Sequence, residues 1–171
     1  MLDRFERGFL WFNRWLLVVL LAAMSLIVFC NVALRYLTTE SLVWAEEVAR
    51  HLMIWLTFLG SGLVLRHGGH IAIDNLQDVL PRAAARALRL VIVAALMAFF
   101  AAMIWFGAVY VGRTMLQTTS ATQIPFGYVY AAMPAGFLLL AIHLLFIARD
   151  FVLERKFRPD ADLDSTLGSS L

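Results

Sequence analysis

Four apolar runs, each long enough to cross a lipid bilayer, dominate this 171-residue sequence. A transmembrane helix needs about 20 consecutive apolar residues, and such runs occupy residues 15–34, 42–65, 87–112 and 126–148. Only 15% of the residues are charged, whereas a soluble domain carries about 25%. The sequence therefore predicts a single all-α integral membrane domain over residues 1–158, with four transmembrane helices.

Two segments outside the four runs have their own patterns. Within residues 71–80, Ile73, Leu76 and Leu80 recur at helical spacing, but the segment is too short to span a bilayer. We expect a short amphipathic helix there, lying in the membrane interface between the second and third spans. Residues 159–171 are small and polar, which predicts a disordered tail.

The distribution of arginine and lysine predicts the orientation of the chain. Of the 14 such residues, all but three lie before the first run, between the second and third, or after the fourth. Loops rich in Lys and Arg stay in the cytoplasm, so we expect both termini there, in a multi-pass protein of the bacterial inner membrane. The three residues on the opposite side are Arg35, Arg50 and Arg113.

Composition also excludes several classes of protein. The net charge is only +2, so the basic residues reflect membrane-flanking positions and not a nucleic-acid-binding surface. The single cysteine, Cys30, excludes an intrachain disulfide, a cysteine-ligated iron–sulfur cluster and a structural zinc site. His51 and His143 are expected at opposite ends of their spans, which disfavours a bis-histidine haem. We therefore expect no cofactor and no metal.

A charged cluster at the start of the second run is the most unusual feature. Glu46 and Glu47 lie four and three residues before Arg50, so either acid can pair with the arginine on one helix face. One interpretation is a self-compensated cluster at the membrane interface. Another is a docking point for a partner protein, because charges at membrane depth usually face protein or water. A proton or ion relay is disfavoured, because residues 52–65 contain no further ionisable side chain.

No arrangement of nucleophile, base or phosphate-binding loop indicates an enzyme. The chain also lacks the paired, interrupted helices from which secondary transporters build substrate sites. What remains is a membrane subunit that supports another protein. The alternatives are a small membrane-anchor subunit of a redox complex and an autonomous small carrier. Within the fourth run, Pro134 is expected to kink the helix.

Several short motifs, in order along the chain, resemble those of one transporter family. They are Asn31-Val-Ala-Leu-Arg35-Tyr36, Trp44-Ala-Glu46-Glu47-Val-Ala-Arg50, Trp55-Leu-Thr-Phe-Leu-Gly60, then Arg66 with Gly69-His70-Ile71-Ala-Ile73-Asp74, and finally Ile124-Pro125 with Tyr130 and Met133-Pro134-Ala-Gly136. Together they resemble the small permease subunit of tripartite ATP-independent periplasmic (TRAP) transporters, the DctQ-like family. The resemblance covers about residues 10–155.

The resemblance implies a function that the residues alone do not reveal. Such a subunit supports a large permease subunit during ion-gradient-driven uptake of an organic acid, which a periplasmic substrate-binding protein delivers. Contacts with the partners or with membrane lipid are then expected near the outer face. The residues expected to make the partner contacts are Trp44, Glu46, Glu47, Arg50, Arg35 and Tyr36, whereas Arg66, Gly69, His70 and Asp74 are expected to fix the cytoplasmic turn and the interfacial helix.

Overall fold

The computed structural model describes residues 2–38, 40–66 and 81–154, and this part of the chain is helical. The only pairing of β type within it is an isolated bridge between Thr118 and Pro125. The helices, in chain order, are α1 (Leu2–Thr38), α2 (Ala45–Arg66), α4 (Arg82–Thr114), α5 (Phe126–Tyr130) and α6 (Ala132–Glu154).

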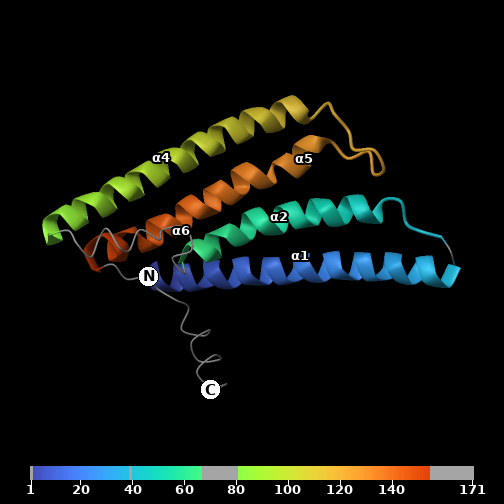
Figure 1. Cartoon of the computed structure of the whole chain (residues 1–171), viewed down its shortest axis with the longest axis horizontal. Helices are drawn as coiled ribbons and strands as arrows, with labels where there is room; N and C mark the ends of the chain where they lie inside the picture. The colour runs from blue at the N-terminus through green and yellow to red at the C-terminus, as the bar shows by residue number, and fades with distance from the viewer. Residues whose placement is uncertain (1, 39, 67–80, 155–171) are drawn as a thin grey trace, which may run out of the picture.

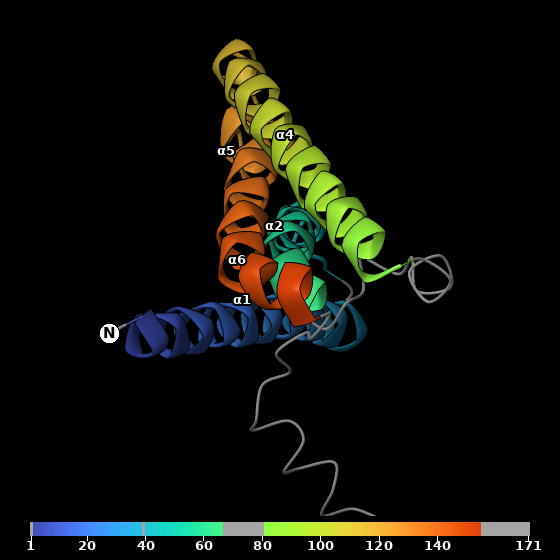
Figure 2. The same ribbon diagram turned by 90° about the vertical axis from the view of Figure 1, so that its left-hand side faces the viewer.

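The helices are arranged as an open row and not as a closed bundle. α2 packs against α1 on one side and α6 on the other, and α6 in turn packs against α4 (Figure 1). α1 and α4 therefore lie at opposite edges of the row, clearly inclined to each other (Figure 2). The end of α1, the start of α2, the end of α4 and α5 all lie at one end of the row, here named the α5 end (Figure 1).

The four predicted spans are confirmed within the described residues. Four helical stretches are long and apolar enough to cross a membrane. The first and third are longer than the apolar runs, since they cover Glu6–Thr38 and Ala83–Thr114. The second begins at Ala45 and not at residue 42, and the fourth has the predicted bounds. The predicted interfacial helix over residues 71–80 and the predicted tail over residues 159–171 lie outside the described residues.

The buried core lies where α2, α4 and α6 meet, away from the α5 end. Elsewhere large apolar side chains point outward, such as Phe29 with 70% of its surface exposed and Trp105 with 69%. Membrane helices associate through close van der Waals packing, because the lipid around them is as apolar as their side chains. The outward residues therefore suit a surface covered by lipid or by another membrane protein. The core residues are Leu65, Phe100, Leu140, Leu144, Ile147 and Phe151.

The fourth span is interrupted at Ala131, between α5 and α6. Pro134 stands four residues after Tyr130 and has no N–H group, so the Tyr130 carbonyl has no helical donor at that position. Gly107 of α4 packs against the proline ring: a Cβ at that glycine would lie 3.0 Å from the proline Cδ. The interruption therefore lies one turn before the proline, where the sequence predicts a kink.

A buried polar contact joins α1, α2 and α6. Asn13, which is 1% exposed, donates a hydrogen bond of 3.4 Å to the Leu59 carbonyl, and its Nδ2 lies 3.5 Å from Nε2 of His143. The His143 ring also contacts Phe9, with the ring centroids 5.1 Å apart. Gly62 makes room for this ring, since a Cβ there would lie 2.3 Å from its Cδ2. Polar groups away from water favour being hydrogen-bonded, so this contact fixes how α1 lies on its neighbours.

Arg89 ties the first turns of α4 to the end of α6, and its loss is expected to separate them. Its side chain is buried and donates hydrogen bonds of 3.2 Å to the carbonyls of Ala85 and Phe151. Phe151 lies in the last turn of α6, where carbonyls lack helical donors and a cation is favourable. We expect Arg89→Gln to lower the free energy of unfolding by about 1–3 kcal/mol, measured by denaturation in detergent.

The matched control is Arg86→Gln, which removes the same charge from an exposed position on the same helix. Its effect should stay within about 0.5 kcal/mol. Equal destabilisation by the two substitutions would show that the charge matters and the contact with α6 does not.

Candidate partner-binding site

The first turn of α2 is held in place at the α5 end of the row. The Leu42 N–H donates a 2.7 Å hydrogen bond to the Asn31 side-chain oxygen of α1. The Ala45 N–H then bonds to the Leu42 carbonyl at 3.0 Å, which starts the turn of helix. The segment before α2 is therefore anchored to α1, and this fixes where the acidic residues of the first turn, Glu46 and Glu47, lie.

The connection between α4 and α5, residues 115–125, is built by its own hydrogen bonds. The Phe126 N–H bonds to the Gln117 carbonyl at 2.8 Å, and the Thr119 N–H bonds to the Ile124 carbonyl at 2.9 Å. The buried Thr119 hydroxyl accepts a 3.1 Å hydrogen bond from the Ile124 N–H. Gln123 adopts a positive φ of 55°, which non-glycine residues rarely do. The connection is therefore a defined, tightly turned structure.

Glu47 joins these two parts of the molecule. Its carboxylate accepts hydrogen bonds from the N–H groups of Ala121 at 2.8 Å and Thr122 at 3.1 Å. The Thr122 hydroxyl donates to the same carboxylate. Hydrogen bonds to an ionised acceptor are stronger than those between neutral groups. A single side chain of α2 thus organises the tip of the 115–125 connection, here named the Glu47 clip: Glu47, Ala121 and Thr122.

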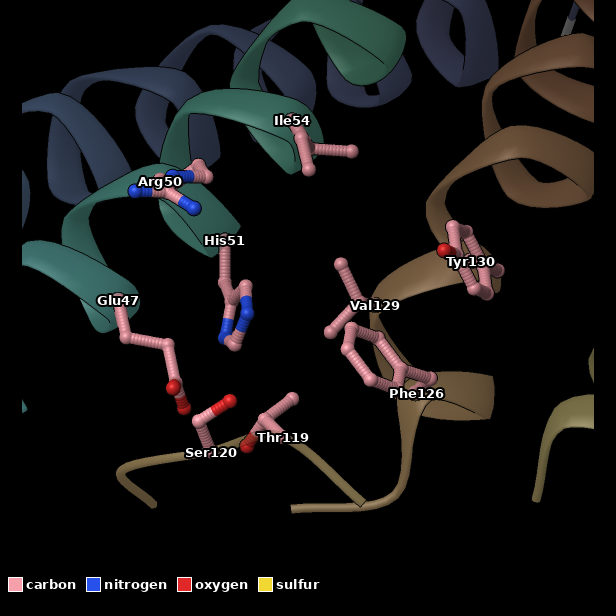
Figure 3. A pocket seen from close by; sticks show the side chains of 9 residues that line it. All are labelled: Glu47, Arg50, His51, Ile54, Thr119, Ser120, Phe126, Val129 and Tyr130. Carbon is pink, nitrogen blue, oxygen red and sulfur yellow. The ribbon is translucent and has the colours of Figure 1, made fainter. Parts of the chain in front are cut away.

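A cleft of about 240 Å³ opens beside the Glu47 clip, between α2, the 115–125 connection and α5. Figure 3 shows the Glu47 carboxylate directed towards the connection, whereas the Arg50 guanidinium lies away from it. His51 extends between α2 and Val129 of α5 (Figure 3). The cleft is lined by Glu47, Arg50, His51, Ile54, Thr119, Ser120, Phe126, Val129 and Tyr130.

The other residues predicted for a partner interface lie near one another at the α5 end. Arg35 and Tyr36 are in the last turn of α1, and Trp44 precedes α2. These three side chains, with Glu46 and Arg50, are exposed, whereas Glu47 is half-buried by the connection that it holds. Their positions leave them available to a partner.

The residues predicted for the cytoplasmic turn are described less completely. α2 ends at Arg66, whereas Gly69, His70 and Asp74 lie outside the described residues. In the part of the chain that is described, no group of three or more His, Cys, Asp and Glu side chains could hold a metal ion.

Sequence reasoning missed the partner of Glu47 and the role of Asn13. The signal for the first was the hydroxyl-rich stretch over residues 118–122, which follows a long helix and precedes Pro125. Such residues favour turns with exposed backbone N–H groups, which a nearby carboxylate can bind. No local signal connects Asn13 with His143, because 130 residues separate them in the sequence.

Comparison with known proteins places the chain among transport proteins. Residues 24–152 match the family described as "Tripartite ATP-independent periplasmic transporters, DctQ component". The ectoine TRAP transporter small permease protein TeaB of Halomonas elongata is 36% identical over 126 residues, which are 69% of this chain and 62% of the relative. The C4-dicarboxylate TRAP transporter small permease protein DctQ of Vibrio cholerae is 29% identical over 99 residues, 52% of this chain and 43% of the relative.

A longer relative also matches. The isethionate TRAP transporter permease protein DctMQ of Oleidesulfovibrio alaskensis is 25% identical over 143 residues, which are 82% of this chain but only 22% of that protein. The chain thus spans less than two thirds of the length of each of these relatives. The family match covers most of the chain, including all of α2 and α4, most of α6 and the last part of α1, so this chain belongs to the DctQ family of TRAP transporter small permeases.

Proposed function

We propose that this chain is the small membrane subunit of a TRAP-type secondary transporter, which anchors and stabilises a large permease subunit. The family match over residues 24–152 carries this proposal. The transporter would take up an organic acid or a similar small solute, driven by an ion gradient and delivered by a periplasmic substrate-binding protein. Relatives are named for ectoine, C4-dicarboxylates and sialic acid, so the substrate class is small polar organic solutes.

The open row of helices is consistent with a subunit that packs against another membrane protein. α1 and α4 lie at the two edges, and each exposes many large apolar side chains. A membrane helix that packs on only one side can take a further helix on the other. The clefts found among the described residues are small and lie between helices at the surface of the row. The substrate path is therefore assigned to the partner.

A much longer relative supports the proposal of a large partner. In the Oleidesulfovibrio permease, the region similar to this chain makes up 22% of the protein. Most of that permease therefore lies outside the region similar to this chain. We propose that this chain works with a large permease component of that kind.

The exposed residues at the α5 end are the proposed partner contacts. We assign direct contact to Trp44, Glu46, Arg35 and Tyr36, which lie together on α1 and at the start of α2. Glu47 acts indirectly, because its carboxylate is occupied by the 115–125 connection. The excess of arginine near the opposite end supports an orientation with both termini in the cytoplasm and the α5 end facing the periplasm.

An uptake assay tests the proposal. Proteoliposomes containing this chain and the large permease subunit, with the binding protein and a labelled solute outside, should accumulate the solute when an ion gradient is applied. Vesicles with this chain alone should accumulate none above background. Equal uptake by this chain alone would favour the autonomous carrier, and a haem absorbance band in the purified chain would favour the redox subunit.

A further inference from the structure

The cleft beside the Glu47 clip has a polar end and an apolar end. Arg50, His51 and Ser120 give it polar groups, whereas Ile54, Phe126 and Val129 line the rest. Arg50 is exposed, and Ser120 presents its hydroxyl on the side of the cleft in Figure 3. A cleft with this division of lining suits an amphiphilic molecule and not a purely apolar one.

The charges in the cleft favour an anionic head group. The Glu47 carboxylate is turned to the 115–125 connection and accepts hydrogen bonds from two N–H groups and one hydroxyl there. These donors compensate its negative charge, and it does not point at the arginine (Figure 3). The guanidinium of Arg50 therefore remains as the cation of the cleft. Arginine binds phosphate oxygens through two parallel N–H groups.

The position of the cleft along α2 matches the depth of lipid phosphates. Arg50 lies within the first two turns of the membrane span Ala45–Leu65, and Ile54 lies one further turn into it. Side chains at the beginning of a span lie in the interfacial region, where lipid head groups are found, and those further along lie at the depth of the acyl chains. Arg50 thus lies at the depth of head groups, whereas Ile54 lies further into the span, towards the acyl chains.

We infer that this cleft binds one phospholipid of the outer leaflet, with its phosphodiester on Arg50 and an acyl chain along Ile54 and Val129. Ser120 and His51 supply further donors to the phosphate. The lipid would fill the space between α2 and α5 and support the 115–125 connection from the membrane side. This inference does not depend on which large subunit the chain assembles with.

A second cleft provides an internal comparison. It shares His51 and Val129 with the first cleft and has a volume of about 210 Å³. Its other lining residues are Val48, Leu52, Trp55, Ile124 and Tyr128. No arginine or lysine lines it. It offers a phosphate hydrogen-bonding groups on His51 and Tyr128 but no guanidinium, so a lipid beside it should be held much more weakly than one on Arg50.

Native mass spectrometry of the full chain tests the inference. The chain is reconstituted into nanodiscs of phosphatidylethanolamine and phosphatidylglycerol and then released under mild conditions. The wild type should retain one phospholipid, identified by its mass. Arg50→Gln should reduce the retained fraction by about tenfold, because the charge-assisted hydrogen bonds to the phosphate are lost. Arg50→Lys should retain an intermediate fraction, because the charge remains but the paired geometry does not.

Two further variants keep the test decisive. Arg113→Gln removes another exposed arginine, in the last turn of α4 and outside the cleft, and should leave the lipid count unchanged. Ile54→Trp should displace the lipid by filling the apolar end, and it tests the site even where Arg50→Gln does not fold. Equal lipid retention in the wild type and both cleft variants would overturn the inference. A second result would also overturn it: Arg50→Gln keeps its lipid in this experiment but no longer co-purifies with the large subunit. That result would place an acidic side chain of the partner, and not a lipid, on Arg50.

Discussion

Replacing Glu47 with glutamine is expected to release the tip of the 115–125 connection while leaving the helices folded. The Ala121 and Thr122 N–H groups bond to different oxygens of the carboxylate. In glutamine one of these oxygens becomes an NH₂ group, which cannot accept a hydrogen bond, so one of the two N–H groups loses its acceptor. Hydrogen–deuterium exchange of a peptide covering the connection should speed up by about tenfold, as expected for local opening. Recovery of the proposed large partner should fall with it, because the surface at the α5 end loses its fixed shape.

Glu46→Gln is the matched control for this experiment. It removes the same charge one residue earlier in the same turn of α2, from an exposed side chain. Exchange in the connection should then match the wild type. Thr122→Val removes only the hydroxyl donor and should give an intermediate rate. If exchange were unchanged in Glu47→Gln, the carboxylate would not hold the connection, and its role in shaping the outer surface would be wrong.

Gly136→Ala is expected to destabilise the packing of α6 on α2. A Cβ at Gly136 would lie 2.7 Å from both the Cβ and the backbone oxygen of Phe58, and 3.0 Å from its carbonyl carbon. Two of these atoms belong to the α2 backbone, so a change of side-chain rotamer cannot relieve the clash. The two central helices would have to separate, at a cost of about 1–3 kcal/mol. Thermal unfolding in detergent measures the loss.

Gly60→Ala is the matched control, because it adds the same methyl group to α2 itself. A Cβ there would meet nothing nearer than the Leu17 side chain at 3.8 Å, an ordinary contact. Alanine also has a helix propensity better than that of glycine by about 1 kcal/mol, so this variant should be as stable as the wild type or more so. Equal stability of the two variants would show that α2 and α6 do not pack as closely as described.

The four spans could be predicted because a membrane imposes a simple requirement. A helix that crosses a bilayer must be long and apolar, whatever its neighbours are. Run length and composition therefore located all four helices, and only the positions of some of their ends differed. The first helix begins at Leu2, and its Asn13 donates a hydrogen bond to α2, a contact that hydropathy does not report.

The candidate site could be predicted only in part. Glu46, Glu47 and Arg50 are conspicuous because charges near membrane depth are costly. Which of these side chains makes contacts within the chain depends on the tertiary structure. Glu47 bonds to a residue 74 positions further along the sequence, whereas Arg50 takes no part in the Glu47 clip. Spacing alone indicated that either Glu46 or Glu47 could pair with Arg50.

Arg89 illustrates the same limit at the other end of the row. In the sequence it is one of several arginines flanking the third span, and it contributes to the expected orientation. In the structure it is buried and binds the Phe151 carbonyl, 62 residues away. A count of flanking charges treats it as equivalent to the exposed Arg86, although only Arg89 holds two helices together.

Affinity purification of this chain from native membranes tests the central claim most directly. The chain carries a tag at its C-terminus, the membranes are solubilised in a mild detergent, and the proteins recovered with it are identified and quantified. We expect a large multi-pass permease protein in a fixed ratio to this chain. Recovery of this chain alone, folded and in several detergents, would contradict the proposal that it is the supporting subunit of a larger transporter.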